Sequence, residues 1–226
     1  MIPVTVTQAW RSAHAGALIG LLEVSGVANA SASPELDARK RAVETKLRER
    51  FGRSTRADLI ALPVMRDYVR YYKRFDKTYH VLQQLESVAL KGKPLPSVSP
   101  LVDANFAAEL DTLVLTAGHD VGKLQPPLRI DVSVEADTLV QMGGSAKRLP
   151  TGDMVMRDAH AVSCSILYGQ DNRSALSAST TAALYVAYAP AGVGEQAVRA
   201  QLDAILANVR LIAPACTLEQ LALLPA

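Results

Sequence analysis

The pattern of the chain changes within residues 91–120, which read KGKPLPSVSPLVDANFAAELDTLVLTAGHD. Apolar residues before this stretch recur at helical spacings of three and four, whereas short apolar runs bounded by turns follow it. The stretch itself reads as a turn at Lys91-Gly92, a short apolar approach and a row of polar side chains that ends at Asp120. Helices gathered ahead of strands predict an α+β fold rather than an alternating parallel sheet.

Three helices are predicted ahead of the change. The first begins at Ser33-Pro34 and ends at Gly52, because serine caps helix N-termini, proline fits the first turn and glycine often ends a helix. Its basic residues, Lys40 among them, are expected to face solvent. The second is predicted over residues 63–77 and the third over residues 79–90. The inward face of the second comprises Met65, Tyr68, Val69, Tyr72 and Phe75.

Strands are predicted at both ends of the chain. Residues 17–27 are nearly all apolar and suit a central strand, and residues 4–6 suit a short one. The later strands are expected at residues 113–115, 128–134, 138–142, 154–156, 161–167 and 184–188. Residues 195–212 return to an amphipathic helix. The short apolar segment 217–226 either folds back on the body or docks on another subunit of a homo-oligomer or complex.

Length and composition favour one domain over residues 1–226. The 226 residues include 49% apolar residues, but no uninterrupted apolar run approaches the roughly 18 residues that span a bilayer. The first residues lack the pattern of a secretory signal, so a cytoplasmic protein without a membrane segment is expected. Two cysteines are too few for a disulfide framework or a cysteine-rich zinc site, and no cofactor is predicted.

Charge is distributed unevenly along the chain. Residues 39–93 hold 15 Lys and Arg against six acids, a net charge of +9, which leaves −7 for the rest because the whole chain carries +2. A basic lobe of this kind suits a polyanion such as RNA. Its second helix also carries aromatic residues that could stack on bases, although their inward spacing suits a core equally well. The candidate RNA-binding residues are Arg66, Arg70, Lys73, Arg74 and Lys77.

Further motifs follow the stretch in a characteristic order. They are Met142-Gly143-Gly144, the turn Pro150–Asp153, the segment from Cys164 to Arg173, and Ser179-Thr180-Thr181. This order resembles the B3/B4 domain of the phenylalanyl-tRNA synthetase beta subunit in its freestanding form, over residues 60–190. The resemblance implies a three-layer β/β/α sandwich, here with extra N- and C-terminal helices. In the synthetase the domain edits, hydrolysing tRNA mischarged with tyrosine.

The resemblance also selects candidate site residues. Those expected to bind the aminoacyl ligand are Asn105, Asp120, Asp158, Gln170 and Arg173, and those expected to position the attacking water are His119 and Thr180. An aminoacyl pocket needs an acceptor for the amine and donors for the ester carbonyl, which these residue types supply. The alternative is that each of these residues merely fixes a turn or caps a strand.

The chain departs from the family pattern in one place. Many freestanding relatives carry Cys-Arg, a tryptophan and another arginine where this chain has Cys164-Ser165, Leu167 and Gln170. The loss of two guanidinium groups and a large ring indicates a different end group, lost activity or a pocket reshaped for another small metabolite.

Other chemistries have little support in the sequence. The four histidines have no metal-ligand spacing, and no Gly-x-Ser-x-Gly elbow is present. The function that the resemblance implies is binding of aminoacyl-tRNA or its aminoacyl end, with hydrolysis of a mischarged ester in trans. The alternative is a noncatalytic module that binds RNA or an amino-acid-like ligand.

Overall fold

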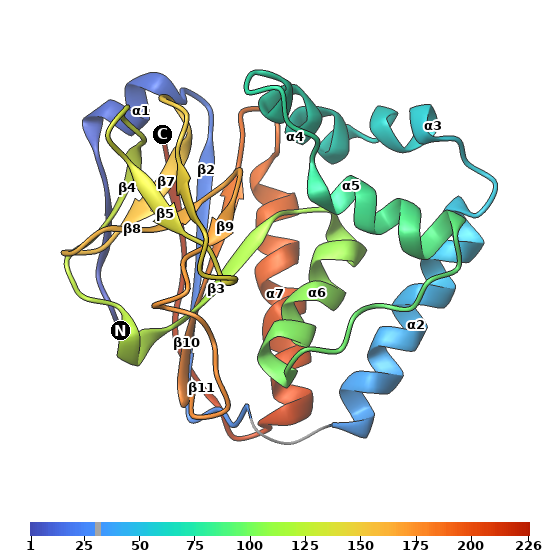
Figure 1. Cartoon of the computed structure of the whole chain (residues 1–226). Helices are drawn as coiled ribbons and strands as arrows, with labels where there is room; N and C mark the ends of the chain where they lie inside the picture. The colour runs from blue at the N-terminus through green and yellow to red at the C-terminus, as the bar shows by residue number, and fades with distance from the viewer. Residues whose placement is uncertain (30–32) are drawn as a thin grey trace.

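The computed structural model describes residues 1–29 and 33–226 and has an α+β fold, as predicted (Figure 1). The outer, five-stranded sheet has the order β1 (Val4–Val6), β4 (Leu128–Val132), β7 (Met154–Arg157), β8 (Val162–Ser165) and β9 (Gly169–Gln170). The middle, four-stranded sheet has the order β11 (Thr217–Pro225), β2 (Leu18–Ser25), β10 (Ala182–Ala189) and β3 (Thr116–Asp120). A small ribbon pairs β5 (Thr138–Val140) with β6 (Ala146–Arg148).

Helices cover the face of the middle sheet that is turned away from the outer sheet (Figure 1). They are α2 (Pro34–Phe51), α3 (Arg56–Ala61), α4 (Pro63–Lys73), α5 (His80–Leu85), α6 (Pro100–Thr112) and α7 (Glu195–Ile212). Two further elements are α1 (Gln8–Ala13), at one end of the sheets, and a 3-10 turn (Val121–Lys123) after β3. Among the described residues, no helix is both long and apolar enough to cross a bilayer.

Strand β2 is the central strand that its apolar sequence predicts. It pairs antiparallel with β10 on one side and with β11 on the other. Helix α7 lies directly on it, since a Cβ added to Gly20 would come within 2.5 Å of Val198 Cγ1. Glycine at position 20 therefore sets how closely α7 packs on the sheet.

Helix α2 begins as predicted but buries one of its charges. Ser33 Oγ accepts a hydrogen bond from Leu36 N at 3.2 Å, and Gly52 is the C-cap. The expectation that Lys40 faces solvent is wrong, because Lys40 is buried and its Nζ lies 2.7 Å from Asp103 Oδ2 on α6. An ion pair between the two helices replaces the hydration of both charges.

The aromatic residues of the basic lobe belong to the core. Helix α4 ends at Lys73, four residues earlier than predicted, and the third predicted helix is α5 followed by a π-helical turn, Glu86–Leu90. Four tyrosines of this region are at most 4% exposed: Tyr68, Tyr71, Tyr72 and Tyr79. Their stacking on RNA bases is therefore ruled out by burial, and the core interpretation of the inward spacing is correct.

Helix α6 was not predicted. Residues 101–105 were expected to be an apolar approach and residues 113–115 a strand, but the helix runs to Thr112 and Leu113 ends it in a left-handed conformation, φ 66°. Most of its residues are buried, the polar Asp103, Asn105 and Glu109 included. A helix enclosed on most sides has no polar stripe, so no helical periodicity is visible in its sequence.

The C-terminal segment folds back on the body. It forms β11, which pairs antiparallel with β2 at the edge of the middle sheet. The prediction that residues 217–226 fold back on the body is confirmed, and docking of this segment on another subunit stays a prediction.

Candidate functional site

A cavity of about 240 Å³ lies where β3 and β8 of the two sheets approach helices α5 and α6. Its walls are largely apolar, with Phe106 and Leu176 among them, while its polar groups come from widely separated parts of the chain. Residues with polar side chains in the lining include His80, Gln84, Asn105, Glu109, Ser165 and Gln170. Apolar walls with a few convergent polar groups are typical of a small-molecule site.

Asn105 is one of the predicted residues that reach this cavity. Its Nδ2 donates to the backbone oxygen of Thr116 at 2.9 Å, and its Oδ1 accepts from Gln201 Nε2 at 3.4 Å. The amide thus joins α6 to β3 and α7. Since an amide nitrogen carries two hydrogens, one donor remains beside the cavity.

Gln170 is the second predicted residue at the cavity. It ends the short strand β9 and is half-buried. Within the described residues its side-chain amide makes no hydrogen bond to protein, so both its donors and its oxygen can serve a ligand.

Glu109 lines the cavity and was missed by the sequence analysis. It is buried in α6, and its Oε1 accepts a hydrogen bond from Thr116 N at 2.7 Å. Burial raises the pKa of Glu109 to about 8, although that hydrogen bond lowers it. The carboxyl group is therefore mostly neutral at pH 7 and can both donate and accept. The sequence feature that could have marked Glu109 is an acidic residue within the otherwise apolar run Phe106–Leu110.

Ser165, at the end of β8, also lines the cavity. Its Oγ donates to Asp153 Oδ2, and Tyr71 donates to the other oxygen of Asp153 at 2.8 Å. Burial raises the pKa of Asp153 to about 7. The Ser165 hydroxyl is thus held by a buried acid.

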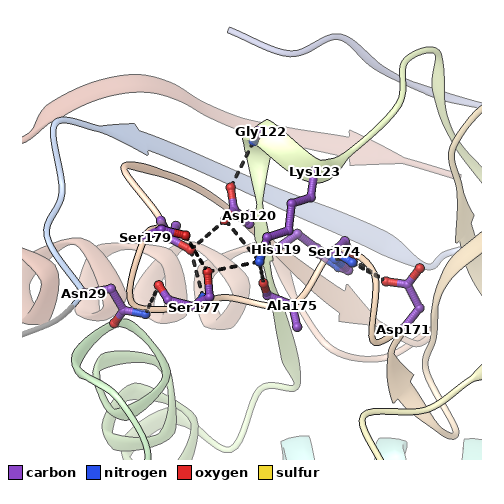
Figure 2. Close-up of polar contacts among 11 residues, drawn as sticks. Asn29, His119, Asp120, Gly122, Lys123, Asp171, Ser174, Ala175, Ser177 and Ser179 are labelled. Atoms are coloured by element: carbon purple, nitrogen blue, oxygen red, sulfur yellow. Dashed lines mark hydrogen bonds and ion pairs between the residues drawn. The ribbon is translucent and has the colours of Figure 1, made fainter. Parts of the chain in front are cut away.

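Asp120 is the last residue of β3 (Figure 2), and its carboxylate is hydrogen-bonded to Thr180 in a closed turn. Asp120 Oδ1 accepts from Gly122 N at 3.0 Å, and Oδ2 accepts from Thr180 Oγ1 at 2.7 Å. Thr180 Oγ1 in turn accepts from Ser177 N at 2.9 Å. These bonds join the end of β3 to the segment before β10, which favours the interpretation that both residues fix a turn.

His119 is fully buried and does not line the cavity. Its Nδ1 lies 2.7 Å from Ser174 Oγ, and Ser174 Oγ donates to Asp171 Oδ1 at 2.5 Å (Figure 2). Burial lowers the pKa of His119 to about 4. A water-positioning role for His119 stays a prediction, and its Nε2 is sealed from solvent without a protein partner in the described residues.

Asp158 and Arg173 form an ion pair outside the cavity lining. Arg173 Nη1 lies 3.1 Å from Asp158 Oδ2, and its Nη2 lies 2.9 Å from Asp171 Oδ2. Burial favours a higher pKa for Asp158, but hydrogen bonds from Ala161 N and from the guanidinium hold that pKa below its ordinary value. Of the seven predicted site residues, Asn105 and Gln170 therefore line the cavity. The other five form hydrogen bonds or ion pairs beside it.

The five candidate RNA-binding residues are all exposed on or just after α4. Some have protein partners: Arg70 Nη2 lies 3.0 Å from Asp67 Oδ1, and Arg74 lies 5.4 Å from the centre of the Tyr71 ring. Acids from elsewhere in the chain neutralise part of the basic lobe, since Asp111 pairs with both Arg39 and Lys46. The positive surface is accordingly smaller than the charge count suggests.

The part of the chain that the structure describes contains no cluster of three or more His, Cys, Asp or Glu side chains that could hold a metal ion. The structure thus combines two sheets and a helical layer in an α+β fold, with a small, largely apolar cavity between α5, α6 and the sheets.

The structure is similar to that of an N-terminal fragment of the phenylalanyl-tRNA synthetase beta subunit from Pyrococcus horikoshii, with a TM-score of 0.52 and 8% sequence identity. The match covers 100% of this chain and 55% of that one, so the chain spans about half the length of the fragment. No protein-family description matches the sequence, and no curated protein matches it. The predicted family resemblance is thus confirmed as a distant structural resemblance.

Proposed function

We propose that the chain is a B3/B4-like domain whose cavity binds the aminoacyl end of an aminoacyl-tRNA. The observation that carries the proposal is the cavity of about 240 Å³, with apolar walls and the uncommitted amide of Gln170. Drug-sized ligands occupy pockets of roughly 300–1,000 Å³, so this cavity suits a smaller group such as one amino-acid residue. The fold similarity to the synthetase fragment supports tRNA as the carrier.

Hydrolysis of a mischarged ester in trans is the proposed reaction. An aminoacyl ester is already reactive, so holding a water against its carbonyl carbon is enough and no covalent nucleophile is needed. Asn105 and Gln170 would donate hydrogen bonds to the ligand, and the neutral carboxyl of Glu109 would bind a polar group of the amino acid.

Deacylation of a panel of tRNAs charged with correct and incorrect amino acids tests the proposal, with filter binding of the same tRNAs alongside. We expect selective hydrolysis that weakens in Gln170→Ala. The matched control is Gln196→Ala, because Gln196 is exposed on α7. Equal hydrolysis by both variants would remove Gln170 from the site, and no hydrolysis by the wild type would refute the reaction.

A noncatalytic binding module is the second candidate. It is favoured by the commitment of Asp120, Thr180, Asp158 and Arg173 to internal contacts, and by Ser165 in place of an arginine. In that case the same panel gives tRNA or amino-acid binding without turnover.

A further inference from the structure

His80 lies on the boundary between the cavity and a neighbouring groove. The groove, of about 250 Å³, runs between the end of α5, the segment before α6 and α6 itself, and Leu95 and Leu110 line it. His80, Gln84 and Phe106 line both spaces. A ligand whose amino-acid part fills the cavity and whose ester points toward the groove would pass the imidazole of His80.

The hydrogen bonds around His80 determine which ring nitrogen carries the proton. Tyr72 Oη lies 2.5 Å from the backbone oxygen of Ile166 and 3.3 Å from His80 Nδ1. A carbonyl oxygen can only accept, so the single hydroxyl proton of Tyr72 is donated to Ile166. The contact with His80 therefore requires a proton on Nδ1, and Nε2 keeps its lone pair.

The imidazole is neutral at physiological pH. Burial lowers the pKa of His80 to about 4. The titratable groups near it are the hydroxyls of Tyr72 and Tyr79, together with the carboxyl of Glu109, the thiol of Cys164 and the hydroxyl of Tyr188, which line the same cavity. Burial raises the pKa of all five, so His80 has no ionised neighbour among them at pH 7.

Burial lowers the pKa of three histidines, His14, His80 and His119, and His80 differs from the other two. The Nε2 atoms of His14 and His119 are sealed from solvent. His80 Nε2 is not sealed, and no protein group in the described residues hydrogen-bonds to it. An accessible lone pair on a residue that lines the cavity meets the geometric requirement for a general base.

We infer that His80 Nε2 is the base for the proposed hydrolysis, an inference that rests on the proposed function. Nε2 accepts a proton from a water as the water oxygen bonds to the ester carbonyl carbon. The tetrahedral intermediate then breaks its bond to the ribose oxygen, which takes the proton back from Nε2. The products are the free amino acid and the uncharged tRNA.

The variant His80→Asn tests this role with little change in shape. An asparagine amide places an N–H near the position of Nδ1 and keeps the bond to Tyr72, but supplies nothing at the position of Nε2. We expect deacylation to fall by about 10²–10⁴-fold, with tRNA binding and thermal unfolding unchanged. The matched control His160→Asn, at an exposed turn, should hydrolyse as the wild type does.

The outcomes separate the two proposals. A wild type that deacylates no charged tRNA overturns the proposed reaction and the role of His80 together. If the wild type is active and the His80→Asn variant is equally active, only the role of His80 is overturned. Nitrogen NMR of the histidine rings is a second measurement that does not depend on activity. An Nδ1-protonated, neutral His80 at pH 7 supports the inference, and an Nε2-protonated ring overturns it.

Discussion

Asn105 and Glu109, one turn apart on α6, bind the two backbone groups of Thr116. Asn105 Nδ2 donates to the Thr116 oxygen at 2.9 Å, and Glu109 Oε1 accepts from Thr116 N at 2.7 Å. Strand β3 is at the edge of its sheet, so these side chains satisfy peptide groups that a further strand would otherwise pair. The same two side chains line the cavity, which links the polar character of the site to the position of β3.

Glu109 should make stability fall as pH rises. Its pKa is raised to about 8 in the folded chain from an ordinary 4.5, so the folded state binds more protons between these values and loses stability across that window. Glu109→Gln should flatten this part of the pH dependence. Urea denaturation from pH 5.5 to 8.5 measures it.

The control for that measurement is Glu49→Gln, at an exposed position on α2, which should keep the slope of the wild type. Asp153 has a pKa of about 7 and contributes in the same direction below that pH, but it does so equally in all three proteins. Equal slopes in wild type and Glu109→Gln would show that Glu109 ionises normally.

Lys40→Met should destabilise the chain strongly, because it leaves the Asp103 carboxylate buried without its partner. Breaking a buried pair in this way costs about 3–5 kcal/mol. Lys46→Met on the same helix removes an exposed partner of Asp111 and should cost about 0–1 kcal/mol. Urea denaturation at pH 7 compares them, and similar losses would contradict the assignment of a buried pair.

Gly20→Ala should loosen the packing of α7 on β2. The added methyl group would lie 2.5 Å from Val198 Cγ1, and overpacking of this kind costs about 1–3 kcal/mol. Gly143→Ala is the matched change, since a Cβ there meets nothing within 4 Å. Thermal unfolding of the two variants should therefore differ, with only Gly20→Ala clearly less stable.

Thr180→Val should lower the stability of the fold without weakening ligand binding. It removes the hydroxyl that joins Asp120 to Ser177 N and leaves buried groups unsatisfied, at a cost of about 1–3 kcal/mol. Binding of aminoacyl-tRNA at a temperature where the variant is folded should match the wild type. Lost binding in a folded variant would instead place Thr180 in the site.

The double change Lys73→Glu with Arg74→Glu should weaken tRNA binding and reduce its salt dependence, because both are exposed members of the candidate RNA-binding set on and after α4. Each lost phosphate contact lowers the slope of log K against log salt by about one. The matched control, Lys147→Glu with Arg148→Glu on β6, changes charge by the same amount elsewhere. If both pairs have the same effect, net charge and not this surface governs binding.

Much of the framework was predictable from local pattern. Ser33, Pro34 and Gly52 bounded α2, and the amphipathic spacing of residues 195–212 matched α7. Helix α6 was missed since its enclosure on most sides removes the polar stripe on which such a prediction depends. The burial of Lys40 was missed for a related reason: its partner, Asp103, lies 63 residues away in the chain.

The sequence by itself determined the α+β class, the central strand β2 and the helices with caps and stripes, because those follow from neighbouring residues. Only the tertiary structure decided which polar side chains share the cavity. Asn105 and Gln170 reach it, while Asp120 and Thr180 close a turn, and His80 enters it although no motif marked that residue. Burial and hydrogen-bond partners depend on segments far apart in the chain, so the chemical role of a polar residue is settled only when those segments pack.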